Sequence, residues 1–187
     1  MNKNFIITGQ RRTGKSSLIK EYIDTYRQEI SGLFVQRIYD DEKKVNAYRL
    51  VDYASKEEYI LDIPERPGLK MDNIFLKTEE KGVSYTNPEI FETTGKDILE
   101  KSLAFKKYLV VIDEIGSVEE DAELYKKAVR DVLDARIPVL GIIQNIKTPF
   151  IDEIRNRPDV EILNLDEISR EKAEKQVYEF LRECGFY

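Results

Sequence analysis

The chain has 187 residues, a length that suits one domain, and a formal net charge of −6, which argues against a constitutive nucleic-acid binder. It contains no histidine and a single cysteine, which excludes histidine-liganded metals, a Ser-His-Asp triad, an internal disulfide and a cysteine-cluster metal site. The sequence has neither the ~18 continuous apolar residues of a membrane span nor a basic-then-apolar export signal. We therefore expect a cytoplasmic protein with a single domain over 1–187 and no membrane or nucleic-acid partner.

The first half of the chain predicts one strand, one helix and then a β-rich insert. An apolar run over 4–8 predicts a buried strand that ends at Gly9, and apolar residues at helical spacing predict a helix from 16 to about 28. The insert covers about 32–86 and contains strand-forming runs separated by turns, which is typical of β-hairpins. Its strands are expected to begin at Leu33 and to cover 45–53, 59–63, 73–77 and 83–85, with a loop over 64–68.

The second half alternates apolar strands with amphipathic helices. Asn87-Pro88-Glu89 is a good helix start, and this helix should run to about 105 with a weak point at Gly95. Further elements are expected as strands over 108–112, 137–143 and 160–165, helices over 119–133 and 149–155, and a last helix capped by Asp166. The alternation predicts an α/β fold with a mixed, mostly parallel sheet and helices on both faces.

The segment between the first strand and the first helix reads GQRRTGKS and fits the phosphate-binding pattern G-x-x-x-x-G-K-[ST]. Its two glycines allow the loop to turn N–H groups inward as a cradle for phosphate oxygens, at the positive end of the helix. Lys15 should reach the β- and γ-phosphates, and Ser16 should place its hydroxyl on Mg²⁺. Arg11 and Arg12 either lean over the phosphates or point into solvent, and Ser17 serves the helix start. The predicted nucleotide-binding residues are Gly9, Gln10, Arg11, Arg12, Thr13, Gly14, Lys15, Ser16 and Ser17.

Two acids follow the apolar run Leu109-Val110-Val111-Ile112. On a parallel strand, Asp113 would lie at the carboxyl edge beside the phosphate loop, where it orients Mg²⁺ through its water shell. Glu114 is expected to point to the other side of the strand and to orient an attacking water or take its proton. The strand over 137–143 ends at Gln144, which is either a contact for the γ-phosphate or the water, or an ordinary loop amide.

These motifs resemble a family of small nucleoside-triphosphatases, first described from thermophiles and also called cancer-related nucleoside-triphosphatases. The resemblance covers most of the chain and is strongest over VIDEIGSVE, which begins at Val111 and ends at Glu119. It implies slow, Mg²⁺-dependent hydrolysis of nucleoside triphosphates with loose base preference, on a P-loop fold related to RecA-like and AAA-type cores. It assigns Lys15 and Glu114 to catalysis, and Ser16 and Asp113 to the metal. Glu119 and Arg170 also match the family, without a role that we can assign.

Three functions are compatible with these residues. The first is a hydrolase in which water attacks the γ-phosphate, and we favour it because Glu114 beside Asp113 suits water. The second is a nucleotide or small-molecule kinase whose acceptor would occupy the β-rich insert. The third is a nucleotide-dependent switch with little turnover. Arg155 and Arg157 are either charge stabilisers over the γ-phosphate or surface arginines.

Overall fold

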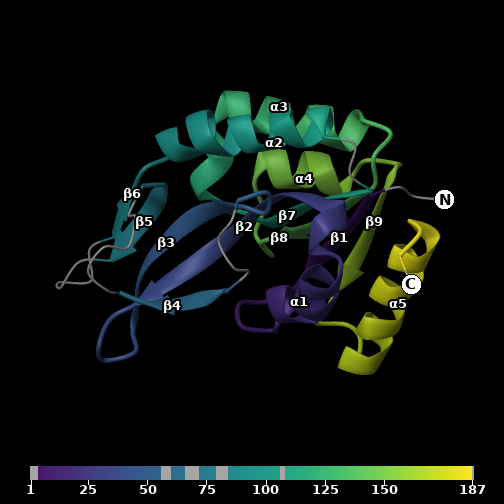
Figure 1. The fold of residues 1–187 in the computed structure, drawn as a ribbon, viewed down its shortest axis with the longest axis horizontal. Coiled ribbons are helices and arrows are strands. Elements are labelled where there is room, and N and C mark those ends of the chain that lie inside the picture. The colour runs from purple at the N-terminus through teal and green to yellow at the C-terminus, as the bar shows by residue number, and fades with distance from the viewer. Residues whose placement is uncertain (1–3, 56–59, 66–71, 79–83, 106–107, 187) are drawn as a thin grey trace.

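The computed structural model describes residues 4–55, 60–65, 72–78, 84–105 and 108–186. Within these ranges, nine strands form one sheet (Figure 1). The strands are β1 (Asn4–Thr8), β2 (Ile30–Tyr39), β3 (Val45–Asp52), β4 (Asp62–Pro64), β5 (Ile74–Thr78), β6 (Ser84–Thr86), β7 (Leu109–Ile115), β8 (Val139–Ile143) and β9 (Val160–Asn164).

The sheet runs in the order β6-β5-β3-β2-β7-β8-β1-β9, and β4 pairs with β2. The pairs from β2 through β7, β8 and β1 to β9 are parallel, whereas β2–β3, β3–β5 and β5–β6 are antiparallel. The predicted mixed, mostly parallel sheet is therefore confirmed. Because β2 pairs in parallel with β7, the first strand of the β-rich insert also belongs to the central sheet.

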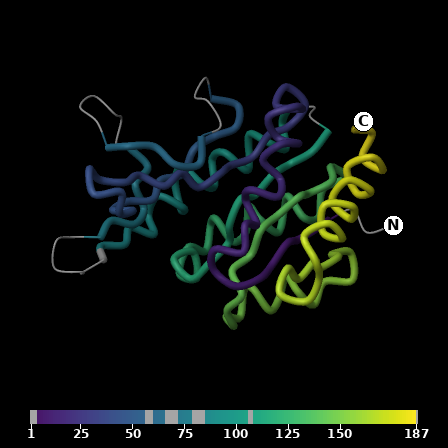
Figure 2. Tube along the Cα trace, turned by 90° about the horizontal axis from the view of Figure 1, so that it is seen from below, coloured from purple at the N-terminus to yellow at the C-terminus, as the bar shows by residue number. Residues whose placement is uncertain are grey.

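Helices cover both faces of this sheet, as the alternation of strands and helices predicted. Residues of α2, α3 and α4 join one apolar core, and residues of α1 and α5 join the other. In Figure 1 the first group lies above the sheet and the second below it. Figure 2 places the C-terminal helix at one end of the molecule and the strands of the β-rich insert at the other. The helices are α1 (Lys15–Thr25), α2 (Lys96–Ala104), α3 (Glu123–Asp134), α4 (Pro149–Arg155) and α5 (Arg170–Glu183).

Several boundaries differ from the sequence prediction. Helix α1 ends at Thr25, and a short 3₁₀ turn, Arg27–Glu29, replaces its expected last turn. Strand β2 begins at Ile30, before the expected Leu33, because its first residues pair with β7. Helix α3 begins only at Glu123, since the preceding acids form a separate 3₁₀ turn.

The weak point expected at Gly95 is a π-helical turn, Phe91–Gly95, that leads directly into α2. A Cβ at Gly95 would lie 3.0 Å from the Tyr125 ring, so glycine lets this turn pack closely on α3. Most of the expected loop over 64–68, and the first residues of the strands expected over 59–63 and 83–85, lie outside the described residues. Within the described residues, no helix is both long enough and apolar enough to cross a bilayer.

Candidate active site

The phosphate-loop motif forms the turn between β1 and α1, as its flanking pattern predicted. Gly9 and Gly14 have φ angles of 146° and 81°, values that glycine adopts without steric cost. Gly14 precedes α1 in the left-handed conformation, and neither a side-chain cap nor an acidic residue in the first turn neutralises the start of that helix. The first N–H groups of α1 are thus available to an anion at the positive end of the helix dipole.

Lys15 folds back over this loop. Its Nζ donates hydrogen bonds to the carbonyl oxygens of Gly9 at 2.8 Å and Gln10 at 2.7 Å. The ammonium group therefore lies at the mouth of the loop, where the motif predicted contact with phosphate oxygens. Arg11 and Arg12 are exposed on the same loop, and Ser17 is exposed on the first turn of α1.

Three carboxylates act electrostatically on the Lys15 ammonium group. Partial burial lowers the Lys15 pKa, and the negative charges of Glu114, Asp166 and Asp113 act against this shift. Asp113 and Glu114 lie near the end of β7, and Asp166 lies after β9. All three act on the same cation because the carboxyl ends of parallel strands meet at one edge of the sheet. The site thus combines a cation for phosphate with acids for a metal ion and for water.

Ser16 and Asp113 form a direct contact between the phosphate loop and β7. The Ser16 hydroxyl donates to Asp113 Oδ1 at 2.9 Å. Burial raises the pKa of the Asp113 carboxyl to about 7, and the Ser16 hydrogen bond opposes this effect. The second oxygen, Oδ2, is buried and has no hydrogen-bond partner among the residues that the structure describes, so its capacity to accept is unused there.

Glu114 does not follow the simple alternation of a strand. It is the extra residue of a β-bulge, because the pairing of β7 with β8 shifts between Asp113 and Ile115. Its φ angle is 87°, in the left-handed region that non-glycine residues seldom adopt. The regular alternation on which the expected direction of Glu114 is based does not apply at this bulge. Of the three carboxylates that oppose the lowering of the Lys15 pKa, Glu114 has the largest effect.

Asp166 belongs to the site, although the sequence suggested only a helix cap. Both of its oxygens accept a hydrogen bond from the Gln10 backbone N–H at 3.0 Å, and Oδ2 also accepts from Asn145 Nδ2 at 3.2 Å. The cap of α5 is instead Ser169, whose hydroxyl accepts from the Lys172 N–H. The signal that could have revealed Asp166 is its position two residues after the end of β9, because residues that follow a parallel strand lie at the carboxyl edge of the sheet.

Glu119 is almost completely buried. Its Oε2 accepts a hydrogen bond from the Gly116 N–H at 3.0 Å. Burial raises the pKa of Glu119 to about 8, and the nearby Glu114 charge adds to the shift. Glu119 therefore closes the loop after β7 rather than facing the phosphate loop.

The sequence does not settle the roles of three arginines outside the phosphate loop, and these three lie in different parts of the fold. Arg170 donates from Nη1 to the Gly14 carbonyl at 3.0 Å, so α5 contacts the phosphate loop. Arg155 donates to the Ile146 carbonyl at 2.8 Å and to the Gln144 carbonyl at 3.2 Å, and so supports the loop after β8.

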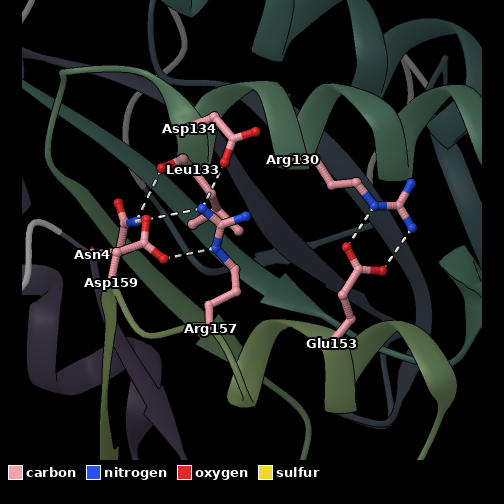
Figure 3. Close-up of polar contacts among 7 residues, drawn as sticks. All are labelled: Asn4, Arg130, Leu133, Asp134, Glu153, Arg157 and Asp159. Carbon is pink, nitrogen blue, oxygen red and sulfur yellow. Dashed lines mark hydrogen bonds and ion pairs between the residues drawn. The ribbon is translucent and has the colours of Figure 1, made fainter.

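Arg157 lies at the opposite, amino edge of the sheet. Figure 3 shows it beside Asn4, the first residue of β1, and it pairs with Asp134 at 2.6 Å and Asp159 at 2.9 Å. The phosphate loop follows the carboxyl end of β1, so the role of charge stabiliser over the γ-phosphate is wrong for Arg157. Figure 3 also shows the ion pair between Arg130 of α3 and Glu153 of α4, which joins two helices on one face of the sheet.

A glycine-rich phosphate loop, a strand-end acid bonded to the loop serine and a mostly parallel sheet together define a P-loop nucleotide-binding protein. The family model described as NTPase matches residues 4–178, and the chain belongs to this family. Nucleoside-triphosphatase THEP1 of Thermotoga maritima is 27% identical over 177 residues, which cover 95% of this chain and 94% of that protein. THEP1 of Aquifex aeolicus is 24% identical over 173 residues, which cover 89% and 92% of the two chains.

Two solved structures share the fold. The crystal structure of THEP1 from Aquifex aeolicus matches with a TM-score of 0.67 and 22% identity over 93% of this chain and 96% of that one. The solution structure of a human cancer-related nucleoside triphosphatase matches with a TM-score of 0.63 and 22% identity over 96% and 95%. The predicted P-loop fold and the resemblance to this family are therefore confirmed.

Proposed function

We propose that the protein hydrolyses nucleoside triphosphates to the diphosphate and phosphate, with Mg²⁺ as its cofactor. The observation that carries the proposal is the convergence of Lys15, the Ser16–Asp113 pair and Glu114 on one edge of the sheet. A family of nucleoside-triphosphatases supports the same reaction for this chain.

The oxygen donors at the site suit Mg²⁺. Ser16 and Asp113 would hold the ion, and the unpartnered Asp113 Oδ2 is a hard oxygen acceptor next to the serine hydroxyl. Among the described residues, no group of three or more acidic, histidine or cysteine side chains forms a metal cage. Mg²⁺ commonly binds through one or two protein oxygens together with phosphate oxygens and water, and Ser16 and Asp113 would supply the protein oxygens. When bound, the ion neutralises negative charge on the β- and γ-phosphates.

Side chains and backbone N–H groups of the protein bind the phosphates, activate the water and stabilise the developing charge. The N–H groups of the loop and of the first turn of α1 bind phosphate oxygens, and Lys15 moves from the loop carbonyls to the β- and γ-phosphates. Glu114 holds the attacking water and accepts its proton as the water oxygen bonds to the γ-phosphorus. The bond from the γ-phosphorus to the β–γ bridging oxygen breaks in the same step, and the nucleoside diphosphate leaves with that oxygen. The Lys15 ammonium group stabilises the negative charge that develops on the transferred phosphoryl group.

Several finer expectations belong to the same proposal. The phosphate-binding set remains residues 9–17, with Arg11 and Arg12 on its outer side. The loose base preference that the family resemblance implies also belongs to this proposal. The single-domain organisation over 1–187 and a cytoplasmic location also remain predictions.

The test is phosphate release from ATP, GTP, CTP and UTP by the purified protein with Mg²⁺ and no acceptor. Lys15→Ala should lower kcat/KM by about 10²- to 10³-fold, because it removes a cation from the transition state. Glu114→Gln should bind a fluorescent ATP analogue normally but lower kcat by about 10²- to 10⁴-fold. The exposed substitutions Lys175→Ala and Glu161→Gln are matched controls and should change neither value.

The other two functions give different results in this assay. Phosphate transfer that requires an added nucleoside or monophosphate would indicate a kinase. Nucleotide binding without turnover would indicate a switch. Unchanged kcat in Glu114→Gln would contradict the role of Glu114 in handling water.

A further inference from the structure

Gln144 is the first residue after β8, the strand that lies between β7 and β1 in the sheet. Its side-chain Nε2 donates a hydrogen bond of 2.5 Å to Glu114 Oε1. Its backbone N–H donates to the Ile115 carbonyl at 2.9 Å, which continues the pairing of β8 with β7 past the bulge. Gln144 therefore contacts both the bulge and the carboxylate that the bulge presents.

Gln144 is itself held in place from the far side of its loop. Arg155 of α4 donates to the Gln144 carbonyl at 3.2 Å and to the Ile146 carbonyl at 2.8 Å. The backbone of Gln144 is thus fixed by β7 on one side and by a guanidinium group on the other. The anchored backbone fixes the point from which the Gln144 side chain reaches Glu114, so the donor starts from a defined position.

Gly116 makes the space that the Gln144 amide occupies. A Cβ at Gly116 would lie 2.4 Å from both Cδ and Nε2 of Gln144, a distance that no real contact tolerates. Gly116 does not have a positive φ angle, so its φ does not require glycine. The reason for glycine at this position is therefore the close approach of the amide.

Glu114 needs such a partner more than an ordinary strand residue does. It sits on a bulge with a φ of 87°, so the regular sheet does not define where its long side chain points. The bond from Gln144 engages one carboxylate oxygen. A neutral donor leaves the negative charge of the carboxylate intact, whereas an acid at the same place would repel it.

We propose that Gln144 is the positioning residue that holds the Glu114 carboxylate toward the attacking water, and that Gly116 provides the room for this contact. The inference rests on the proposed hydrolysis and on the role of Glu114 in it. Gln144 acts through Glu114, so its removal should lower kcat without a matching change in KM.

The test is a double-mutant cycle measured by phosphate release from Mg²⁺-ATP. Gln144→Met keeps the length of the side chain but removes its donor, and should lower kcat by about 10- to 100-fold, as expected for a displaced catalytic group. KM should change by less than about twofold, because uniform binding of substrate is untouched. In the Glu114→Gln background, Gln144→Met should change kcat by less than about twofold, because the partner that it orients is gone. The slow variants are measured as single turnovers with labelled ATP.

Three further variants sharpen the test. Gln144→Asn keeps the amide but shortens its reach, and should lose as much activity as Gln144→Met. Gly116→Ala should lose activity by the same mechanism and should add little to the loss from Gln144→Met. Gln176→Met makes the same chemical change at an exposed position of α5 and should have normal kcat. Thermal unfolding followed by circular dichroism establishes that each variant is folded at the assay temperature.

The possible failures are distinct. If Glu114→Gln has normal kcat, Glu114 does not position or deprotonate the water, and the proposed role of Gln144 is overturned as well. If Glu114→Gln is slow but Gln144→Met has normal or raised kcat, only the positioning role is overturned. Equal losses from Gln144→Met in both backgrounds would mean that Gln144 acts independently of Glu114, which also overturns the proposal.

Discussion

Replacement of the buried Glu119 by glutamine should change how the stability of the protein depends on pH. The carboxyl is almost completely buried and accepts a hydrogen bond from the Gly116 N–H. Burial raises its pKa from 4.5 to about 8. The folded protein therefore holds the proton on Glu119 over a pH range in which the unfolded chain releases it.

The sign and size follow from proton linkage. The stability contributed by the raised pKa is fully present below pH 4.5 and is lost as the pH rises through about 8. The shift is the difference between 4.5 and about 8. At about 1.4 kcal/mol for each unit, the lost free energy of unfolding is on the order of 5 kcal/mol, a large share of a typical domain's stability.

Glu119→Gln removes this titration and keeps a side-chain oxygen that can accept from Gly116. We expect the variant to match the wild type most closely at pH 5 and to become progressively more stable than it toward pH 8. The measurement is urea unfolding followed by circular dichroism at pH 5, 6, 7 and 8, without nucleotide or metal. Glu161→Gln, an exposed control on β9, should show no such pH-dependent difference.

The difference between Glu119→Gln and the wild type isolates one carboxyl, although other acids also titrate. Asp113 has a raised pKa of about 7 and contributes a trend of the same sign, but it is present in both proteins and cancels. Parallel stability curves for the two proteins across this pH range would refute the reasoning, because they would mean that Glu119 ionises with the same pKa in the folded and unfolded chains.

Three further changes have expected outcomes. Gly32→Ala should destabilise the protein by more than about 3 kcal/mol in urea unfolding, because a Cβ at a φ of 114° would lie 2.0 Å from the Val111 carbonyl oxygen; Gly185→Ala, which meets nothing within 4 Å, should cost much less. Arg157→Ala should lower stability by about 1–3 kcal/mol through its lost ion pairs and leave kcat unchanged, since it lies at the amino edge of the sheet; a large loss of kcat would contradict that placement. Removal of Mg²⁺ with EDTA should abolish phosphate release, and Asp113→Ala should do the same at ordinary Mg²⁺ concentrations; full activity of either would contradict the proposed metal site.

The sequence predicts those parts of the fold that are determined by residues close together in the chain. A short strand-forming segment, NFIIT, that ends before a glycine defines β1. The spacing of Gly9, Gly14 and Lys15 defines the phosphate loop without reference to any other segment. Asp113 could be placed in the site because an acid at the end of a buried parallel strand lies at a known edge of the sheet. In each case, a few neighbouring residues contain the whole physical reason.

The parts that the sequence does not predict depend on partners far along the chain. The bulge at Glu114 exists only in register with β8, so the letters Asp-Glu cannot reveal that the second acid leaves the alternation. Asp166 binds the N–H of Gln10, a residue 156 positions away, and the local pattern suggested only a helix cap. The amino-edge position of Arg157 follows from the strand expected after it, but its ion pair with Asp134 joins it to a helix that ends 23 positions earlier, which no local pattern reveals.

The contacts described above explain the residue pattern in the second half of VIDEIGSVE, the block that most strongly resembles the family. In the stretch from Glu114 to Glu119, the last acid folds back three residues to accept the Gly116 N–H, which fixes the loop after β7. The glycine so fixed leaves room for the Gln144 amide, and that amide holds Glu114 at the start of the block. The two acids therefore have different roles, because one is buried and shapes the loop while the other remains half-exposed at the carboxyl edge. These contacts set the spacing between the two acids. A substitution of Glu119, Gly116 or Gln144 should therefore change the position of the Glu114 carboxylate.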